Sequence, residues 1–485
     1  MSPTFRALRN PNYRLWAAGA LVSNTGTWMQ RVAQDWLVLA VLTDNSGVAA
    51  GVTTGLQFAP MLLLAPLAGA AADRWNRRRL LMTTQAASGA LALVLGLLVV
   101  TGVAQLWHVY VLAALLGVVA ALDSPVRQSF VSEMVPAEDL SNAVGLNSAS
   151  FHGGRLIGPG IAGLLIHGIG LGPVFLLNAA SFGAVLISLS RMQVSALSPA
   201  PRGRRGGIRE GVRYVRGRPD ILLILAIVGA VGTFGLNFQL TTALMARLVF
   251  HQNAQGYGLL GSVLAVGSLT GALLAARREH PGMRHIVGAT LAFGVCASIA
   301  ALMPSYLLFA LALIPAGVAT QTLMTAANTR VQLTTAPELR GRVMALYMAI
   351  FMGGTPIGSP LVGWVGETFG ARWSILLGGL VALVTGGLAW AWWARHPGSV
   401  MEPPEISVQP GTVPHELVPH ERDDVEQRVR HDERHHPAPA PEPLAEDHPH
   451  DGVAHEGAEA LVQVVAPPQD RADPHREPGG RPQPA

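Results

Sequence analysis

One short stretch, GAAADRWNRRRLL at residues 69–81, places an acid and four arginines between two long runs that carry almost no charge. The whole chain of 485 residues is 50% hydrophobic and only 13% charged, so this concentration of charge is unusual. The apolar run at 80–103 reaches the roughly 20 residues that a helix needs to cross a bilayer. Such runs exclude a soluble protein with several buried cores. They predict an all-α integral membrane protein in which the charged stretch is a loop.

The residue types that the chain lacks exclude whole classes of chemistry. All 34 basic residues are arginines, which excludes a P-loop lysine, a Schiff-base lysine and most ATP-driven chemistry. Cys296 is the only cysteine and lies within an apolar run, so we expect neither a disulfide nor a cysteine metal site. No cluster of catalytic acids, bases or nucleophiles is apparent. We therefore expect no cofactor, no metal, no nucleic-acid partner and no enzymatic activity.

Apolar runs between polar breaks predict twelve transmembrane helices. Arginines gather in the loops on the side of the N-terminus, whereas only Arg247 and Arg372 lie near loops on the opposite side. By the positive-inside rule both termini are cytoplasmic, in a bacterial inner membrane, which requires an even number of spans. Arg6, Arg9 and Arg14 lead directly into the first span, so we expect no cleavable signal peptide. The predicted spans are 14–42, 48–72, 80–102, 105–126, 143–168, 172–190, 220–248, 256–276, 285–303, 305–328, 342–366 and 372–394.

The two halves of the chain also repeat one another. GGRLIGPGIAG ends at Gly163 and GGTPIGSPLVG ends at Gly363, an offset of 200 residues. Each stretch has Gly-Gly, Ile-Gly and a closing glycine at the same spacing, which predicts two six-helix repeats, as in parallel-repeat secondary transporters. The last part of the chain lacks aromatic residues and cannot bury a core. The predicted parts are an N-terminal bundle at 1–190, a basic cytoplasmic linker at 191–219, a C-terminal bundle at 220–395 and a disordered cytoplasmic tail at 396–485.

The charged loop resembles the signature loop of the major facilitator superfamily. Asn76 stands where the usual glycine follows the Asp-Arg pair, and asparagine also tolerates left-handed backbone. The resemblance implies the major facilitator fold and a latch, in which ion pairs at the cytoplasmic helix ends hold the outward-facing state. A topology anchor is the alternative, but it explains the arginines and not the acid at this spacing. The matching residues are Gly69, Asp73, Arg74, Arg77 and Arg78.

A second motif lies in the fifth predicted span. Its spacing resembles the signature associated with antiporters and exporters of the same superfamily, with Ala162 replacing one expected glycine. Small residues let a neighbouring helix pack closely, and a Gly-Pro pair bends a helix. Generic small-residue packing is the alternative interpretation, because glycine is abundant throughout. The matching residues are Gly145, Gly154, Gly158, Pro159 and Gly163.

The sequence around these motifs narrows the resemblance to one group within the superfamily. FRALRNPNYRLW and GTWMQRVAQDWLV near the start, and LDSPVRQSFVSEMVP before the fifth span, are similar to the drug and siderophore exporter group that includes the enterobactin exporter. The resemblance covers about residues 5–395 and implies proton-driven export by a monomer. The chain departs from it by lacking the arginine common in the fourth span of proton-coupled drug antiporters.

Charged residues inside the predicted spans are candidates for the pathway of substrate or protons. Each ionisable group at a helix centre costs roughly 2.5–3.5 kcal/mol on insertion scales, so each requires a reason. Arg31 and Asp35 are four residues apart and can pair on one helix face, together with Gln34. They either face a cavity or form a self-neutralised pair at the interface. Arg155 has no acid within four residues on its own helix, so we expect it to face a cavity or a partner such as Asp35.

Other polar residues are candidates because of their positions in the predicted spans. Asp123 and Arg127 at the end of the fourth span are four residues apart and are predicted partners of the latch, with an interfacial ion pair as the alternative. In the second half, charge is scarce, which favours a mostly apolar cavity for amphipathic cargo. Polar residues there either face substrate or join helices by hydrogen bonds. The second-half candidates are Asn237, Gln239, Gln321, Asn328 and Tyr347.

Three functions fit these features. The first is a secondary active transporter that exports small amphipathic or hydrophobic molecules, such as a drug, siderophore or secondary metabolite, by alternating access and proton antiport. The second is a solute importer of the same fold, against which the antiporter-type motif argues. The third is a non-transporting membrane scaffold or sensor, which has no need of a two-state charged loop. The sequence favours the exporter.

Overall fold

The computed structural model describes residues 3–198, 208–278 and 280–395. These residues form helices and connecting turns, and none of them lies in a strand. The predicted all-α membrane fold is therefore confirmed. The predicted tail at 396–485 and part of the predicted linker, 199–207, lie outside the described residues.

The first half contains six long helices, and a short helix η1 (Pro3–Arg9) precedes them. They are α1 (Pro11–Leu37) with its π-helical continuation η2 (Val38–Leu42), α2 (Gly47–Arg74), α3 (Arg77–Val100), α4 (Leu106–Met134), α5 (Ala137–Ile169) and α6 (Leu171–Ser190).

The second half follows two short helices, η3 (Val194–Ala196) and α7 (Ile208–Arg216). Two of its spans are interrupted, so that each is built from more than one helix. The helices are α8 (Pro219–Phe234), α9 (Phe238–Leu244) with its π-helical continuation η4 (Met245–Val249), α10 (Ala254–Ala276), α11 (Met283–Leu302), α12 (Tyr306–Thr334), α13 (Arg340–Gly353), α14 (Thr355–Thr368) and α15 (Ala371–Arg395).

Ten helical segments of the described chain are long and apolar enough to cross a membrane. The remaining two of the twelve predicted spans are α1 and α5, which are 27 and 33 residues long and therefore also long enough. Their hydropathy is lower because they carry polar and charged residues, among them Arg31, Asp35 and Arg155. The two less apolar spans are thus the ones that contain the predicted intramembrane charges.

Several helices continue beyond the predicted apolar runs. α4 ends at Met134 rather than at 126, α5 begins at Ala137 rather than at 143, and α12 ends at Thr334 rather than at 328. The bilayer sets the length of the apolar run but not the length of the helix, which can continue into the interface with charged residues on it. The predicted boundaries were wrong at these ends.

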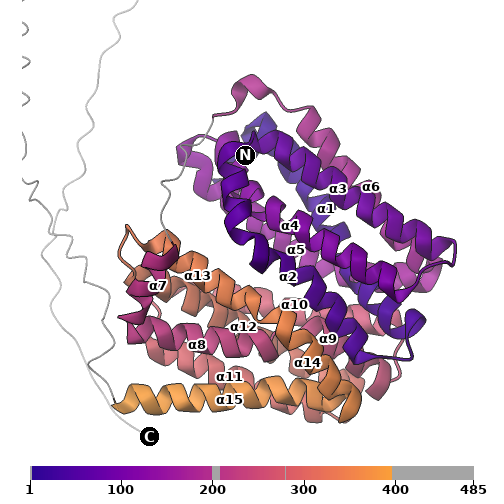
Figure 1. Cartoon of the computed structure of the whole chain (residues 1–485), viewed down its shortest axis with the longest axis vertical. Coiled ribbons are helices and arrows are strands. Elements are labelled where there is room, and N and C mark those ends of the chain that lie inside the picture. Colours follow the sequence, from indigo (N-terminus) through magenta and orange to yellow (C-terminus); the bar gives the residue numbers. More distant parts are fainter. Residues whose placement is uncertain (1–2, 199–207, 279, 396–485) are drawn as a thin grey trace, which may run out of the picture. The chain divides into compact units, whose positions relative to one another are not determined.

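Helix packing follows the internal repeat (Figure 1). In the first half α1 packs on α5 and α6, and α3 packs on α4 and α6. In the second half α8 packs on α13, α14 and α15, and α11 packs on α12 and α15. Between the halves, α2 packs on α14 and α5 packs on α10.

Glycines let helices approach closely at equivalent positions of the two repeats. A Cβ atom at Gly158 would lie 2.7 Å from Cβ of Trp28 on α1, and one at Gly358 would lie 2.6 Å from the carbonyl carbon of Thr233 on α8. Neither position has room for a side chain, so both contacts require glycine. The 200-residue repeat in the sequence is therefore also a repeat of helix contacts.

The repeat continues into the next turn. Gly170 between α5 and α6 has φ of 87°, and Gly370 between α14 and α15 has φ of 103°. This region of backbone conformation strongly favours glycine, which has no Cβ atom to clash with the carbonyl oxygen. Both glycines therefore allow a tight reversal between consecutive helices, through one residue at Gly170 and through two residues, Phe369 and Gly370, in the second half.

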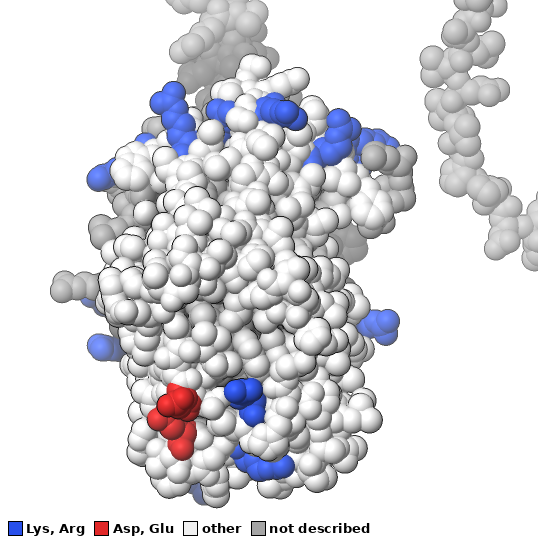
Figure 2. All heavy atoms as spheres, turned by 90° about the vertical axis from the view of Figure 1, so that its right-hand side faces the viewer, with Lys and Arg blue, Asp and Glu red and all other residues white. Residues whose placement is uncertain are grey.

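The surface of the described helices is apolar over much of its area. Large hydrophobic side chains are exposed on many helices; Leu63 is 74% exposed and Leu388 is 67% exposed. Figure 2 shows one face, on which most of the surface is uncharged, arginines gather toward the upper edge and a small acidic cluster lies lower down. An exposed apolar surface of this kind is expected where lipid, and not water, contacts the helices.

Candidate functional site

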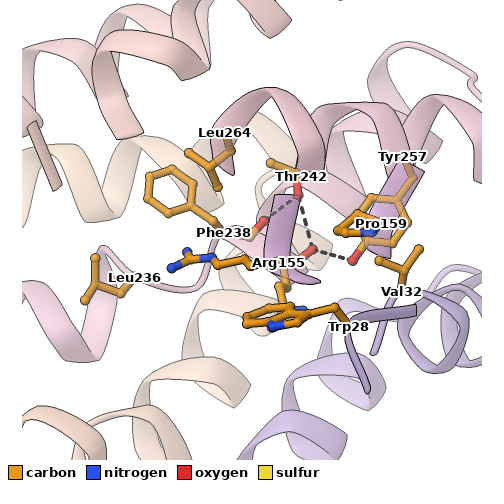
Figure 3. A pocket seen from close by; sticks show the side chains of 11 residues that line it. Trp28, Val32, Arg155, Pro159, Leu236, Phe238, Thr242, Tyr257 and Leu264 are labelled. Atoms are coloured by element: carbon orange, nitrogen blue, oxygen red, sulfur yellow. Dashed lines mark hydrogen bonds between the residues drawn. The ribbon is translucent and has the colours of Figure 1, made fainter. Parts of the chain in front are cut away.

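A cavity of about 90 Å³ lies between helices of the two halves (Figure 3). Trp28 and Val32 of α1 and Arg155 and Pro159 of α5 line it from the first half. The second half contributes the break between α8 and α9, the start of α9, and α10. The lining residues from that half are Leu236, Phe238, Gln239, Thr242, Tyr257, Gly261 and Leu264.

Two arginines share one aromatic ring at this cavity. Cζ of Arg31 lies 4.9 Å from the centroid of the Trp28 ring, and Cζ of Arg155 lies 5.4 Å from it. Cζ of Arg31 also lies 5.6 Å from the ring of Phe58 on α2. Figure 3 shows the Arg155 side chain extending into the cavity toward Leu236. The ring quadrupole of tryptophan stabilises such cations in part, but it does not neutralise them.

Asp35 contacts the second half of the chain. The Tyr257 hydroxyl of α10 donates a hydrogen bond of 2.8 Å to Oδ2 of Asp35, and both side chains are almost fully buried, with 8% exposed for Asp35 and 1% for Tyr257. The ring of Tyr257 also stacks on Trp36, with centroids 6.2 Å apart. Among the described residues no salt bridge joins Asp35 to Arg31 or to Arg155. The expected ion pairs are thus replaced by a hydrogen bond between the two halves.

More contacts between the halves surround the loops at 43–46, 250–253 and 369–370, which we call the gate end. Nε of Arg247 donates to Oδ1 of Asn45 at 3.0 Å, and the guanidinium lies over the ring of Trp36. Oε2 of Glu367 accepts from the Ser46 hydroxyl at 2.9 Å and from the backbone amide of Val48 at 3.0 Å. A carboxylate at the first turn of α2 is favourable because free amides and the helix dipole point toward it.

The opposite end, at the loops 75–76, 135–136, 191–198, 217–218 and 335–339, we call the basic end. Among the described side chains, its ion pairs do not join the two halves: Arg77 pairs with Glu133 at 2.7 Å, and Arg218 pairs with Asp220 at 2.7 Å. Arg342 of α13 pairs with Glu210 of α7 at 2.5 Å. As far as the structure describes them, the gate end has polar contacts between the halves, and the ion pairs of the basic end do not join the halves.

The predicted pair Asp123 and Arg127 forms a salt bridge of 2.8 Å along α4. Oδ1 of Asp123 also accepts hydrogen bonds from the Thr84 hydroxyl at 2.6 Å and from Nε2 of Gln85 at 2.7 Å, both on α3. Asp123 therefore joins α3 to α4 as well as holding Arg127. Their predicted role as partners of a latch stays a prediction.

The structure describes the side-chain contacts of only part of the signature loop. Gly69 and Asp73 lie in α2, but their side-chain surroundings are outside the described residues. Arg74 is exposed, while Nε of Arg78 donates to the carbonyl oxygen of Leu189 at the end of α6. Asn76 has φ of −64° and accepts from the backbone amide of Arg79, so it caps α3. The tolerance of asparagine for left-handed backbone is therefore not used at Asn76, and the residue serves through its side-chain oxygen.

The antiporter-type motif runs along one continuous helix, α5. A Cβ atom at Gly145 would have no neighbour within 4 Å, so this glycine has no close helix contact. Gly154 and Gly158 approach α1, Pro159 lines the cavity, and Gly163 approaches the start of α10. The motif therefore contacts both halves.

The remaining candidates from the sequence lie at different places. Nδ2 of Asn237 donates to the Thr233 carbonyl oxygen at 2.7 Å, and its Oδ1 accepts from the Ser359 hydroxyl at 2.6 Å, so it stabilises the break between α8 and α9 next to the cavity. Gln34 is buried in α1. Gln321 and Asn328 bond within α12, to Thr325 and Gln332 respectively, and do not line the cavity.

Sequence reasoning did not identify the gate-end partners. Tyr257 was missed because it lies at the first turn of an apolar, glycine-rich span, where a tyrosine is an ordinary interfacial residue. Asn45, Ser46 and Glu367 were missed because they lie in or beside short loops with no motif. The positive φ of Asn45, 62°, is common for asparagine in a turn and gave no sign of a contact with Arg247.

Relatives share most of this chain. The sequence family described as transmembrane secretion effectors matches residues 2–404. The multidrug efflux pump Tap of Mycolicibacterium fortuitum is 28% identical over 385 residues, covering 76% of this chain and 93% of that protein. The staphyloferrin A transporter of Staphylococcus aureus is 24% identical, covering 71% and 87%. The enterobactin exporter of Citrobacter koseri is 26% identical, covering 65% and 76%.

Solved structures share the fold. A bacterial homologue of the lysosomal transporter Spinster, in an inward-facing and unoccupied conformation, aligns with a TM-score of 0.63 at 17% identity, covering 81% of this chain and 99% of that one. A POT family transporter in complex with 5-aminolevulinic acid aligns with a TM-score of 0.66 at 12% identity, covering 79% and 96%. Helices, repeat, signature loop and relatives agree, and the chain belongs to the transmembrane secretion effector family of major facilitator superfamily transporters.

Proposed function

We propose that this transporter exports small amphipathic or hydrophobic molecules by alternating access, with protons as the coupling ion, and that it acts as a monomer in a bacterial inner membrane. The observation that carries the proposal is the difference between the two ends of the molecule. Asp35 with Tyr257 and Asn45 with Arg247 join the halves at the gate end, next to a cavity. Alternating access requires contacts of this kind at one end that can be exchanged for contacts at the other.

The distribution of arginines supports an orientation for these two ends. Near the gate end the charged residues include Arg247 and Arg372, whereas many arginines lie near the basic end, among them Arg79, Arg191 and Arg277. The positive-inside rule then places the basic end and both termini in the cytoplasm. The gate end faces outward and is closed in this state. Such a state receives cargo from the cytoplasm or the inner leaflet, as an exporter requires.

Two observations support the outward direction of transport. The stretch from Gly154 to Gly163 has the spacing of the antiporter-type motif, and it contacts both α1 of its own half and α10 of the other. Three relatives are described as a multidrug efflux pump, a staphyloferrin A transporter and an enterobactin exporter, and two of these descriptions state export. An importer of the same fold would load from the opposite side.

Asp35 is the carboxylate that best fits proton coupling. It lies in a buried position of α1 and accepts a hydrogen bond from the other half. Protonation would remove the negative charge that strengthens this hydrogen bond, because bonds to ionised acceptors are about twice as strong as neutral ones. A proton that arrives when the gate is open would thus change the stability of the closed gate.

Transport in everted membrane vesicles tests the proposal. Vesicles with the transporter should accumulate a hydrophobic dye, antibiotic or siderophore-like compound when a proton gradient is present, and an uncoupler should abolish this accumulation. Intact cells that express the protein should accumulate less of the same compound than cells with the empty vector. Asp35→Asn should insert normally and should weaken the dependence of transport on the proton gradient.

Three outcomes separate the proposal from its alternatives. Gradient-driven accumulation into intact cells, with no efflux of any compound tested, would establish an importer and refute export. Efflux that is insensitive to the uncoupler and unchanged in Asp35→Asn would retain export and refute proton coupling. A properly inserted protein that moves no compound in either direction would favour a scaffold or sensor.

A further inference from the structure

The cavity holds more positive than negative charge. Arg155 lines it, Arg31 contacts the ring of the lining residue Trp28, and Asp35 is the nearby acid, bonded to the lining residue Tyr257. Charged groups at this depth are retained only where they have partners or face a cavity. The partner of each of these three groups therefore decides what the cavity can bind.

Asp35 already has its partner. Its Oδ2 accepts the hydrogen bond from Tyr257, and the side chain is only 8% exposed. Arg31, on the same helix one turn earlier, interacts with it electrostatically. A cationic cargo would have to displace these contacts to reach the carboxylate.

Arg155 has no such partner. Within the described parts of the chain it forms no salt bridge and no hydrogen bond. Its guanidinium makes a cation–π contact with Trp28, with Cζ 5.4 Å from the ring centroid. Nε of Arg31 is buried and also lacks a hydrogen-bond partner there. A guanidinium offers five N–H donors in a planar fork that matches an oxyanion, so these donors are left unused.

We propose that the cargo of this transporter is an organic anion, with an oxyanion such as a carboxylate that binds Arg155 and an apolar or aromatic body that packs on Trp28, Phe238 and Leu264. The inference rests on the export proposed above and names the chemical class of its substrate. Arg155 supplies the positive charge that binds the oxyanion. Arg31, which contacts the same tryptophan ring, adds to the positive potential. The apolar side chains of α9 and α10 select against small hydrophilic anions.

The arrangement also explains why the charge of Arg155 is tolerated in α5. In the absence of cargo, the tryptophan ring and the cavity stabilise the guanidinium. When the cargo binds, its negative charge neutralises the site, so that the loaded cavity is less polar than the empty one. A neutral loaded site is easier to move between the two faces of the bilayer than a charged one, because an unpaired charge in apolar surroundings is unfavourable.

Binding of two matched xanthene dyes to the purified full-length protein in nanodiscs tests the inference. Carboxyfluorescein is anionic and tetramethylrhodamine methyl ester is cationic, and their ring systems are similar. The wild type should bind the anionic dye about tenfold or more tightly than the cationic dye. Arg155→Gln should weaken anion binding by about tenfold or more, since a hydrogen bond to a charged group contributes roughly that much. It should leave binding of the cation unchanged or improve it.

Arg284→Gln is the matched control, because Arg284 is exposed on α11 and its loss changes the net charge equally. It should leave both affinities unchanged. Arg155→Gln should keep the unfolding temperature of the wild type, since it removes an unpaired charge, so a loss of binding reports on the site and not on folding. Arg155→Lys, which keeps the charge but not the fork, should bind the anion with intermediate affinity.

The inference is overturned if the wild type prefers the cationic dye, binds both dyes equally or binds neither, or if Arg155→Gln retains the affinity for carboxyfluorescein. These results do not depend on the direction of transport. Movement of carboxyfluorescein into intact cells would refute export but would retain the anion site. Efflux of cations alone would retain export but would refute the anion site.

Discussion

A valine at position 51 should prevent the gate end from closing. Gly51 lies on α2 against α14 of the other half, and a Cβ atom there would be 2.7 Å from the carbonyl carbon of Ser359 and 2.9 Å from Cα of Pro360. Carbon atoms in favourable contact are about 3.5–4.0 Å apart, so the two helices must separate by about 1 Å. Both neighbours are backbone atoms, which cannot rotate out of the way.

Gly51→Val should destabilise only the state in which the gate end is closed. Overpacking of this kind costs about 1–3 kcal/mol. The strain exists where α2 and α14 are in contact and is absent once the halves move apart at this end. The ratio of closed to open gate should therefore fall by roughly 5- to 150-fold, as for a coupling free energy of that size.

Cysteine accessibility measures this ratio directly. Cys296 is the only cysteine of the chain, so Cys296→Ser gives a background without thiols. Thr242→Cys then places one thiol at the cavity, and a membrane-impermeant maleimide is added to intact cells or to everted vesicles. Gly51→Val should raise the labelling rate in intact cells and lower it in everted vesicles.

Gly183→Val provides the control, because it also replaces a helical glycine, but a Cβ atom at this position of α6 has no neighbour within 4 Å. Its labelling rates and transport should match those of the parent protein. If Gly51→Val behaves like Gly183→Val in both assays, closure of the gate end is not a separate state of a moving transporter, and the reasoning from the inter-half contacts fails.

Four further outcomes follow from the same contacts and from the sequence. Tyr257→Phe removes a hydrogen bond to a charged acceptor, worth about 1.5–3 kcal/mol, and should raise outside labelling in the accessibility assay. Asp123→Ala leaves Arg127 without its acid and should lower the free energy of unfolding by about 2–4 kcal/mol, measured by thermal unfolding of purified protein. Asp73→Asn should reduce transport strongly while membrane insertion, checked by fractionation, stays normal. Truncation after residue 400 should preserve both folding and efflux, and a truncated protein that inserts but does not transport would show that the tail is regulatory.

The fold was predictable because its determinants are local. Hydropathy over about 20 residues identifies a span, and the spacing repeated at 200 residues corresponds to repeated helix contacts, while the orientation expected from the arginines stays a prediction. The helix ends at Met134, Ala137 and Thr334 were not predictable in the same way. The helix continues past the apolar run there, and hydropathy carries no information about such an extension.

The sequence indicated the cavity residue Arg155, but not the contacts between the halves. Arg155 was expected at a cavity and lines one, because an isolated charge in a span has few alternatives. The partner of Asp35 was not found, since Tyr257 is 222 residues away. A single sequence gives the position of a residue around its own helix. It does not show which other helix lies against that position. Asn76 illustrates the same limit, because its capping role depends on where α3 begins.

The antiporter-type motif forms two kinds of helix contact, one within its own half and one with the other half. Gly154 and Gly158 hold α5 against α1, a contact within the first half, while Gly163 and Pro159 meet α10 of the second half. In the repeated stretch, Gly358 meets α8 of its own half and Gly363 meets the start of α2. Each stretch thus combines a contact within its own half with a contact to the other half, and the proposed alternating access requires only the second to change. Arg155 lies between Gly154 and Gly158, the two glycines that meet α1, and lines the cavity together with Pro159, so we expect binding of a charge there to depend on how α5 meets α10.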